Sequence, residues 1–347
     1  MNKPVSIAQS TVFCGIDVSA GSLAAALIEP DQPLAQREFA NSSSGHKALI
    51  AWLGKRKAMV RVSLEATGIY SLDLALALHA APRIELAVLN PKLVNRFAQT
   101  LVRSQNDASA ALVLAEYSQR MPFAAWVAPS GRGLQLRVLA RHIYSLVAQQ
   151  TRELNRLHAV EGSRTAPRVV VQDIRRGLTF QARRIAQMRR AAREMIAADA
   201  ELEERFRLLT ATPGIGAISA IQLLAETVLL PPGLTVREWV AHSGLDPAHH
   251  DSGTSVHKRP RISRAGNRHL RRALFMPTLS AVRCDPHMKA YYEALQARHK
   301  TKLQALMAVA RKLLHAIYGI FKTRTTYDGN KLFPEINIVP ELQSASR

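Results

Sequence analysis

The 347-residue chain contains only two cysteines, Cys14 and Cys284, too few for a disulfide framework or a cysteine-based metal site. It also lacks any run of about 18 or more apolar residues, so no segment is predicted to span a membrane. The first residues, MNKPVSIAQST, do not contain the apolar core of a secretory signal peptide. We therefore expect a cytoplasmic protein with reduced thiols.

Acidic residues are scarce, with 26 Asp or Glu against 47 Lys or Arg and a net charge of +21. Such an excess repels itself unless a polyanion offsets it, and nucleic acid is the first candidate, ahead of an anionic membrane surface. Residues 1–125 carry 12 basic and 9 acidic residues, which leaves 35 and 17 for the rest. With only 5% aromatics, extensive base stacking is not the expected mode of binding. Phosphate contacts made mainly by the C-terminal two-thirds are expected.

The N-terminal third predicts strands alternating with helices. Residues 11–30 are typical of two strands joined by a Gly/Ser turn, and residues 61–68 and 84–91 of two more strands. Helical spacing occurs at residues 69–81, 92–102 and 111–121. This order predicts an α/β layer domain.

From about Leu134 the apolar residues follow helical spacing, first in one long helix and, after a loop at 162–167, in a second. The second helix is expected to continue to Leu209, although Asp199 interrupts its apolar stripe. About four heptads is near the lower limit for a coiled coil. Self-association is favoured over packing within one domain, because the opposite face is rich in arginine.

The segment TPGIGAISAIQLLAE, from Thr210, has a glycine-rich turn opening a helix, as in a helix-hairpin-helix. Gly214 and Gly216 would let backbone N–H groups hold a phosphate; a turn that only joins two helices is the alternative. The amphipathic segment at 302–321 is expected to be core.

The stretch HHDSGTSVHKRPRISRAGNRHLRRAL, residues 249–274, surrounds a small polar island at 251–255 with positive charge. It is either a solvated basic loop or a phosphate-binding surface. The candidate phosphate-binding residues are Lys258, Arg259, Arg261, Arg264, Arg268, Arg271 and Arg272. His249, His250 and Asp251 do not predict a catalytic triad with Ser252, since side chains adjacent in sequence rarely converge in that way.

Two carboxylates lie in predicted strands, Asp17 in CGIDVS and Glu65 in SLEATG. Each alone could be a capping or turn residue, but acids at the ends of adjacent strands can converge on one point. Asp107, which starts the helix DASAALVLAEY, could join them or could be only its N-cap. Converging carboxylates suit Mg²⁺, and two such ions clamp the attacking and leaving oxygens of a phosphoryl transfer.

The motifs GIDVS, LEATGIY, NPKLVNRFAQ, LAEYSQRMPFAAW, TPGIGAISA, GLDP, DSGTSV and RISRAGNRHLRRALFMP occur in this order. Together, over about residues 12–325, they resemble the DEDD transposases of the insertion sequence 110 family. The resemblance implies an α/β RuvC-like (RNase H-fold) domain at 11–132 and a helical coiled-coil segment for oligomerisation at 133–207. It further implies a mainly α transposase domain with a catalytic serine at 208–328, followed by a tail at 329–347.

By this resemblance Asp17, Glu65 and Asp107 match the first three of the family's four acids, which hold Mg²⁺, and Ser252 matches its nucleophilic serine. The resemblance also implies donor and target DNA and a bridge RNA as partners. It implies assembly as a dimer or tetramer, with no membrane partner and a place in the bacterial cytoplasm at the nucleoid.

The fourth acid of the family should follow Asp107 by three residues, but that position is Ala110. Glu116 cannot replace it, because nine residues along a helix turn it to the opposite side. The chain is either a homologue with a reduced metal site or an inactivated Asp-to-Ala variant; the otherwise matching pattern NDASAALVLAEY favours the second.

Two other functions remain open. A RuvC-like structure-specific nuclease would use water as its nucleophile and Ser252 only for phosphate contact. A non-catalytic nucleic-acid-binding protein would bind tightly without strand breakage.

We predict that Ala110→Asp raises Mg²⁺-dependent cleavage of DNA, because it restores a fourth oxygen ligand. Cleavage of labelled DNA by the two proteins should be compared on a gel. Equal activity would contradict the prediction.

Overall fold

The computed structural model describes residues 11–56, 58–66, 70–101, 107–252 and 256–335; the described side chains exclude 107–108 and 249–260. The contacts divide the chain into two compact units, unit 1 (Met1–Ala128) and unit 2 (Pro129–Arg347), each described here by itself. Within the described ranges, no helix is both long enough and apolar enough to cross a membrane.

Unit 1 contains one five-stranded sheet with the order β3-β2-β1-β4-β5. β1 pairs antiparallel with β2, which pairs antiparallel with β3, while β4 and β5 extend the sheet as parallel strands. The strands are β1 (Val12–Val18), β2 (Ser22–Ile28), β3 (Ala35–Ala40), β4 (Val60–Glu65) and β5 (Ile84–Leu89). Four of them confirm the sequence prediction. β3 was not predicted, because in AQREFA only Phe39 is buried.

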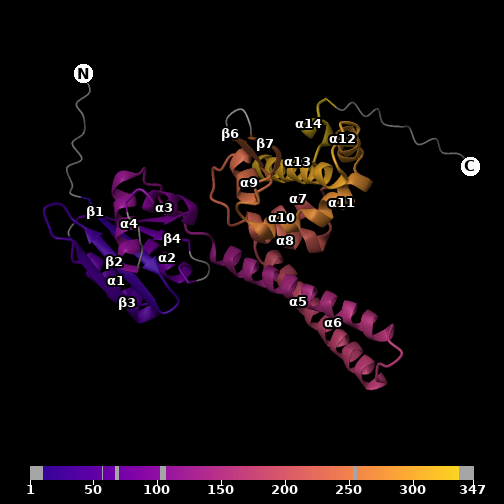
Figure 1. Ribbon diagram of the computed structural model, residues 1–347, viewed down its shortest axis with the longest axis horizontal. Coiled ribbons are helices and arrows are strands. Elements are labelled where there is room, and N and C mark those ends of the chain that lie inside the picture. The colour runs from indigo at the N-terminus through magenta and orange to yellow at the C-terminus, as the bar shows by residue number, and fades with distance from the viewer. Residues whose placement is uncertain (1–10, 57, 67–69, 102–106, 253–255, 336–347) are drawn as a thin grey trace, which may run out of the picture. The chain divides into compact units, whose positions relative to one another are not determined.

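Helices cover both faces of this sheet (Figure 1). They are α1 (Ser43–Gly54), α2 (Leu72–His79), α3 (Pro91–Ala98) and α4 (Asp107–Arg120). On one face Ile16 and Leu64 join Leu49 of α1 and Leu78 of α2 in a buried core. The opposite face is covered by α4, which packs on β1, β2 and β4. α1 had no counterpart in the sequence prediction.

α4 approaches β1 closely because Gly15 has no side chain. A Cβ at this position would overlap the backbone of Ala111 and Ala115 and lie 2.7 Å from the Cβ of Leu114. Ala111 and Ala115 stand one turn apart and are both buried. Small residues on both sides therefore fix where α4 lies on the sheet.

Unit 2 begins with two long helices, α5 (Gly131–Glu161) and α6 (Arg168–Ala197), which lie side by side as a hairpin (Figure 1). Ile143 and Leu146 of α5 and Ile174 and Ile185 of α6 are buried within the single chain. Several side chains of the predicted apolar stripe are thus buried without a second chain. Self-association remains a prediction.

The second long helix does not continue to Leu209, so that prediction was wrong. α6 ends at Ala197, and α7 (Ala200–Thr210) begins after Asp199. The Asp199 carboxylate accepts hydrogen bonds from the backbone N–H groups of Glu201 (3.1 Å) and Leu202 (3.2 Å). The residue that interrupts the stripe is therefore an N-cap that starts a new helix.

The rest of unit 2 is mainly helical. Its elements are α8 (Ala217–Thr227), α9 (Val236–Ser243), β6 (Pro247–Ser252), β7 (Val256–Ile262), α10 (Arg268–Ala273), α11 (Phe275–Cys284), α12 (Pro286–Ala297), α13 (Lys302–Thr323) and α14 (Gly329–Leu332). Leu223 of α8 and Leu313 and Ile317 of α13 are completely buried in its core. The core role predicted for residues 302–321 is confirmed.

The basic stretch at 249–274 has regular structure where it is described. β6 and β7 form an antiparallel hairpin in which Pro247 pairs with Ile262 and Ser252 with Val256, and α10 follows. The interpretation as a solvated loop was therefore wrong for its backbone. Strand pairing was not predicted, because its sequence is charged rather than alternating.

We predict that Gly15→Ala destabilises unit 1 by about 1–3 kcal/mol or more, because the added methyl group displaces α4 from β1. Gly21→Ala is the matched control, since a Cβ at Gly21 meets no atom within 4 Å; it should change stability by less than about 0.5 kcal/mol. Urea unfolding midpoints measure both effects. Equal midpoints would show that the close approach is unimportant.

Candidate metal site and nucleic-acid interface

Asp17 and Glu65 lie next to each other at the C-terminal ends of the neighbouring strands β1 and β4. β1 and β4 are parallel, and their last paired residues, Ile16 and Leu64, immediately precede the two acids. Because strand side chains alternate between faces, both acids stand on the face opposite the Ile16–Leu64 core, which is the face that α4 covers. Both are half-buried. The predicted convergence of these two acids follows directly from the parallel pairing.

The two carboxylates also repel each other electrostatically. Burial raises the pKa of Glu65 above its ordinary value, and the negative charge of Asp17 raises it further. A bound cation would remove both penalties. The pair therefore has the oxygen donors and the concentration of negative charge that suit a hard divalent ion.

The third predicted acid is placed only through its backbone. Asp107 is the first residue of α4 and stands one helical turn before Ala111, which packs at Gly15. Its side chain lies outside the described residues. Ala110, at the position of the fourth acid, is half-buried and brings no ligand. Among the described side chains, His, Cys, Asp and Glu form no cluster of three or more.

Ser252 is the last residue of β6, and its partner Val256 opens β7, so it stands at the far end of the hairpin from Pro247. Its side chain, and those of Lys258 and Arg259, lie outside the described residues. Ser252 belongs to unit 2 and the acid pair to unit 1. That the two act together stays a prediction.

A large open cavity of about 1140 Å³ lies at the base of this hairpin. Five of the arginines predicted to bind phosphate line it, namely Arg261, Arg264, Arg268, Arg271 and Arg272. Lys300 and Arg311 line it as well, although no sequence signal pointed to them because they lie far along the chain. None of its described lining residues is Asp or Glu. We name this site the basic cavity.

Two of these arginines also contact other residues of unit 2. Arg271 donates a hydrogen bond to the backbone carbonyl of Ser243 (2.7 Å), and Arg272 stacks over the ring of Tyr144. Burial lowers the pKa of Arg272, whereas the contact with Tyr144 raises it. These contacts orient the side chains in advance.

Glu226 of α8 is the buried acid beneath this region. It accepts two hydrogen bonds from the Arg141 guanidinium of α5 (2.8 and 2.9 Å) and one from Asn267 (2.7 Å). Burial by itself raises the pKa of Glu226, but the hydrogen bonds from Arg141 and Asn267, together with nearby positive charge, outweigh it, and the pKa is lowered from its usual value. Glu226 was not singled out from the sequence; its signal is a lone acid in the apolar helix AISAIQLLAET.

The glycine-rich turn joins α7 and α8, as predicted, but its glycines differ in role. Gly214 has a φ of 86° and packs against the backbone of Ala281, so it is required by packing. Gly216 is the exposed N-cap of α8 and has open space around it, with no side-chain cap. Only Gly216 leaves room for a phosphate near backbone N–H groups.

Comparisons with known proteins show which family the chain resembles. Residues 14–160 match the model of the DEDD transposases of IS110, and residues 206–293 match the IS116/IS110/IS902 transposase family. The pilin gene-inverting protein of Moraxella bovis is 26% identical over 330 residues, covering 92% of this chain and 98% of that protein. An uncharacterized 43.6 kDa protein of insertion element IS110 from Streptomyces coelicolor is 31% identical over 160 residues, 46% of this chain and 38% of that protein.

These matches identify the class of protein as a DNA transposase or recombinase. The chain belongs to the IS110 family of transposases.

The raised pKa of Glu65 predicts a pH dependence. The folded protein holds this proton more tightly than the unfolded chain, so stability is lost as pH rises from the ordinary glutamate pKa through the raised value. Glu65→Gln should remove the part of this pH-dependent loss of stability that comes from Glu65, because glutamine does not titrate. Glu38→Gln, on the exposed part of edge strand β3, is the control and should retain the wild-type slope.

The measurement is the urea midpoint of metal-free protein between about pH 4 and pH 8. If Glu65→Gln follows the wild-type curve throughout, the two acids do not repel each other as the structure indicates.

Proposed function

We propose that this chain is the recombinase of an insertion sequence, which cuts and rejoins donor and target DNA under the direction of a bridge RNA. The observation that carries the proposal is the Asp17–Glu65 pair beside α4. We infer a RuvC-like (RNase H-fold) domain from the family resemblance, and the mixed five-stranded sheet with helices on both faces supports its α/β character.

Asp17, Glu65 and Asp107 would hold Mg²⁺. Two half-buried carboxylates with a repulsive interaction fit a hard cation with oxygen ligands. When bound, the ion supplies Lewis-acid polarisation of a phosphoryl oxygen and stabilises developing negative charge. Ala110 leaves the site one carboxylate short of the family pattern, and binding should therefore be weakened.

Ser252 would act as the nucleophile. Its Oγ bonds to the phosphorus as the bond from phosphorus to the DNA 3′ oxygen breaks. The serine proton is lost, and the departing oxygen gains a proton to become a free 3′-hydroxyl. In the second step a 3′-hydroxyl of the partner strand attacks the phosphoserine and releases the serine. One phosphodiester is re-formed for each one broken, so no external energy source is needed.

The relatives support strand exchange over simple hydrolysis. The Moraxella proteins are named for inverting a pilin gene, and inversion requires that each cut end be rejoined. A nuclease that uses water would leave ends whose joining needs another energy source. This favours the serine over water as nucleophile.

Nucleic acid would bind over unit 2. The arginines of the basic cavity would contact phosphates of DNA or bridge RNA, together with Lys258 and Arg259. The start of α8 at Gly216 would add backbone N–H contacts. Each phosphate contact should steepen the fall of affinity with salt by roughly 0.7–0.9 in log–log slope.

Assembly into a dimer or tetramer would use the α5–α6 hairpin, which keeps exposed apolar residues such as Val138, Val169 and Phe180. We place the protein in the bacterial cytoplasm with the nucleoid DNA.

A second function is favoured by one observation. With Ala110 in place of the fourth acid, this chain could be a non-catalytic nucleic-acid-binding protein. Such a protein keeps the basic cavity but breaks no strand, even after an acid is restored.

The predicted result is a covalent protein–DNA species that depends on Ser252. The protein is incubated with labelled donor and target DNA, candidate bridge RNA and Mg²⁺, and a denaturing gel compares wild type, Ala110→Asp, and Ala110→Asp with Ser252→Ala. A DNA-shifted protein band should appear with Ala110→Asp and disappear with the double change.

Cleavage without a covalent band would favour the water-dependent nuclease. If restoring the acid produces neither cleavage nor a band, the non-catalytic function gains support and the recombinase proposal loses it.

A further inference from the structure

The basic cavity has a charge that selects its occupant. Its walls bring together cations from β7, α10 and α13, and Lys300 lies just before α13. No acid is found among the described lining residues. Seven cations converging on a concave surface create a strongly positive potential, which favours a polyanion.

Charge alone does not describe this cavity, because large apolar side chains line it as well. Phe275 is 37% exposed, Leu303 59% and Met276 64%, and all three line the cavity. Their exposure to water is unfavourable unless something covers them. An occupant must therefore offer apolar or π surface as well as negative charge.

Double-stranded nucleic acid does not meet this requirement well. A duplex presents phosphates and sugars to a wall of arginines while its base faces remain stacked inside, so the apolar side chains would stay uncovered. An unpaired nucleotide carries a phosphate and an accessible π face together. The stack of Arg272 on Tyr144 adds a flat cationic surface of the kind on which a base also packs.

The cavity also lies close to the candidate nucleophile. Ala248 of β6 lines it, and Ser252 stands four residues further along the same strand, roughly 13 Å away at the usual strand rise. A nucleic-acid strand held in the cavity would thus reach the hairpin end within a few nucleotides.

We propose that the basic cavity binds unpaired nucleotides of a nucleic-acid strand, with phosphates on its arginines and a base against Phe275, Met276 and Leu303. This rests on the proposed function in that nucleic acid is the substrate. It adds that unit 2 distinguishes unpaired from paired strands next to the reacting phosphate.

The test measures binding alone, without cleavage. A short single-stranded DNA oligonucleotide containing 2-aminopurine is titrated with full-length protein, and the same sequence as a duplex is titrated in parallel. Single-strand binding should be tighter and should quench the 2-aminopurine fluorescence through stacking.

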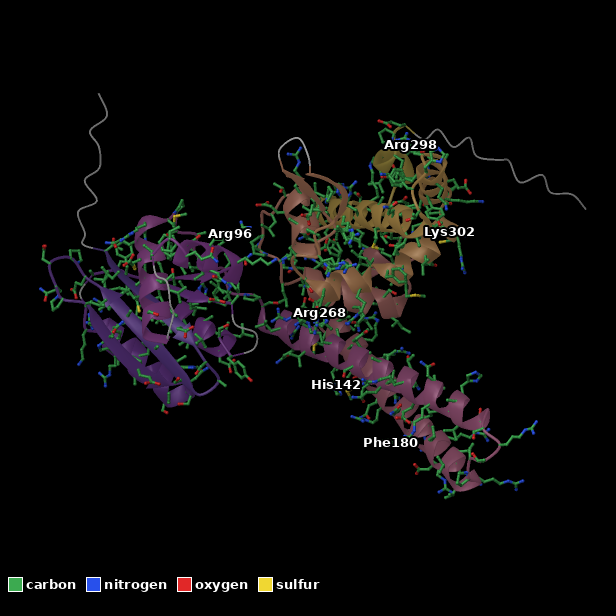
Figure 2. The ribbon with its side chains drawn as sticks, viewed as in Figure 1. Arg96, His142, Phe180, Arg268, Arg298 and Lys302 are labelled. Atoms are coloured by element: carbon green, nitrogen blue, oxygen red, sulfur yellow. The ribbon has the colours of Figure 1, made fainter. Side chains whose placement is uncertain are left out.

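Phe275→Leu keeps apolar bulk but removes the π face, and should weaken single-strand binding by roughly five- to a hundredfold while duplex binding changes less than about twofold. Phe180→Leu is the matched control: Phe180 is an exposed aromatic on the α5–α6 hairpin (Figure 2). Leucine keeps the apolar surface proposed for assembly, so any effect on binding should be the same for single strand and duplex. Arg311→Gln should weaken binding and lower the log–log salt slope for single strands by about 0.7.

Leu303→Gln provides a second variant in case Phe275→Leu unfolds, because Leu303 is exposed in the first turn of α13. It should also weaken single-strand binding selectively. Thermal melting checks that each variant is folded.

The proposal is overturned if duplex binds as tightly as single strand, if Phe275→Leu and Leu303→Gln affect both alike, or if no oligonucleotide binds. An acidic protein segment would then be the better occupant. Selective single-strand binding without any covalent species in the gel assay would leave the cavity assignment standing and remove only the Ser252 chemistry.

Discussion

The buried carboxylate of Glu226 holds together the part of the protein that carries most of its positive charge. Its hydrogen bonds from Arg141 and Asn267 connect α8 to α5 and to the start of α10. Asn267 in turn caps α10, accepting from the backbone N–H groups of His269 (2.9 Å) and Leu270 (3.2 Å). Because α10 carries Arg268, Arg271 and Arg272, one buried acid helps to fix a surface made of mutually repelling cations.

Unit 1 depends on a different constraint, the absence of a side chain at Gly15. Close packing there sets α4 directly on β1. The helix therefore covers the face of the sheet on which Asp17 and Glu65 stand. The parallel pairing of β1 and β4 sets the two acids side by side. The side-by-side placement of the two acids is therefore a consequence of backbone spacing, and Ala110 lies in the same helix that covers them.

The two units carry complementary chemistry. Unit 1 provides acidic oxygen ligands on a rigid sheet, and unit 2 provides a cationic, partly apolar surface with a serine at the end of a hairpin. The Moraxella proteins are similar along nearly their whole length, and the family matches lie in both units. In the proposed function, unit 2 holds nucleic acid and unit 1 supports the phosphoryl chemistry.

By itself, the sequence determined whatever depends on near neighbours along the chain. Apolar strand-like segments predicted β1, β2, β4 and β5, and helical spacing predicted α2 to α5 and α13. Such patterns are local because side-chain direction repeats every two residues in a strand and every three to four in a helix. The order of motifs predicted the family, and the expectation that acids at adjacent strand ends converge anticipated the Asp17–Glu65 pair.

The tertiary structure decided what depends on distant partners. β3 and the β6–β7 hairpin are stabilised by ladder hydrogen bonds to another strand, so their polar sequences carry little local signal. The end of α6 depended on Asp199 acting as a cap. Lys300 and Arg311 join the earlier arginines, and Glu226 reaches Arg141, only because folding brings remote segments together. The basic cavity forms because long-range packing, which no local sequence pattern encodes, brings cationic residues from distant segments together.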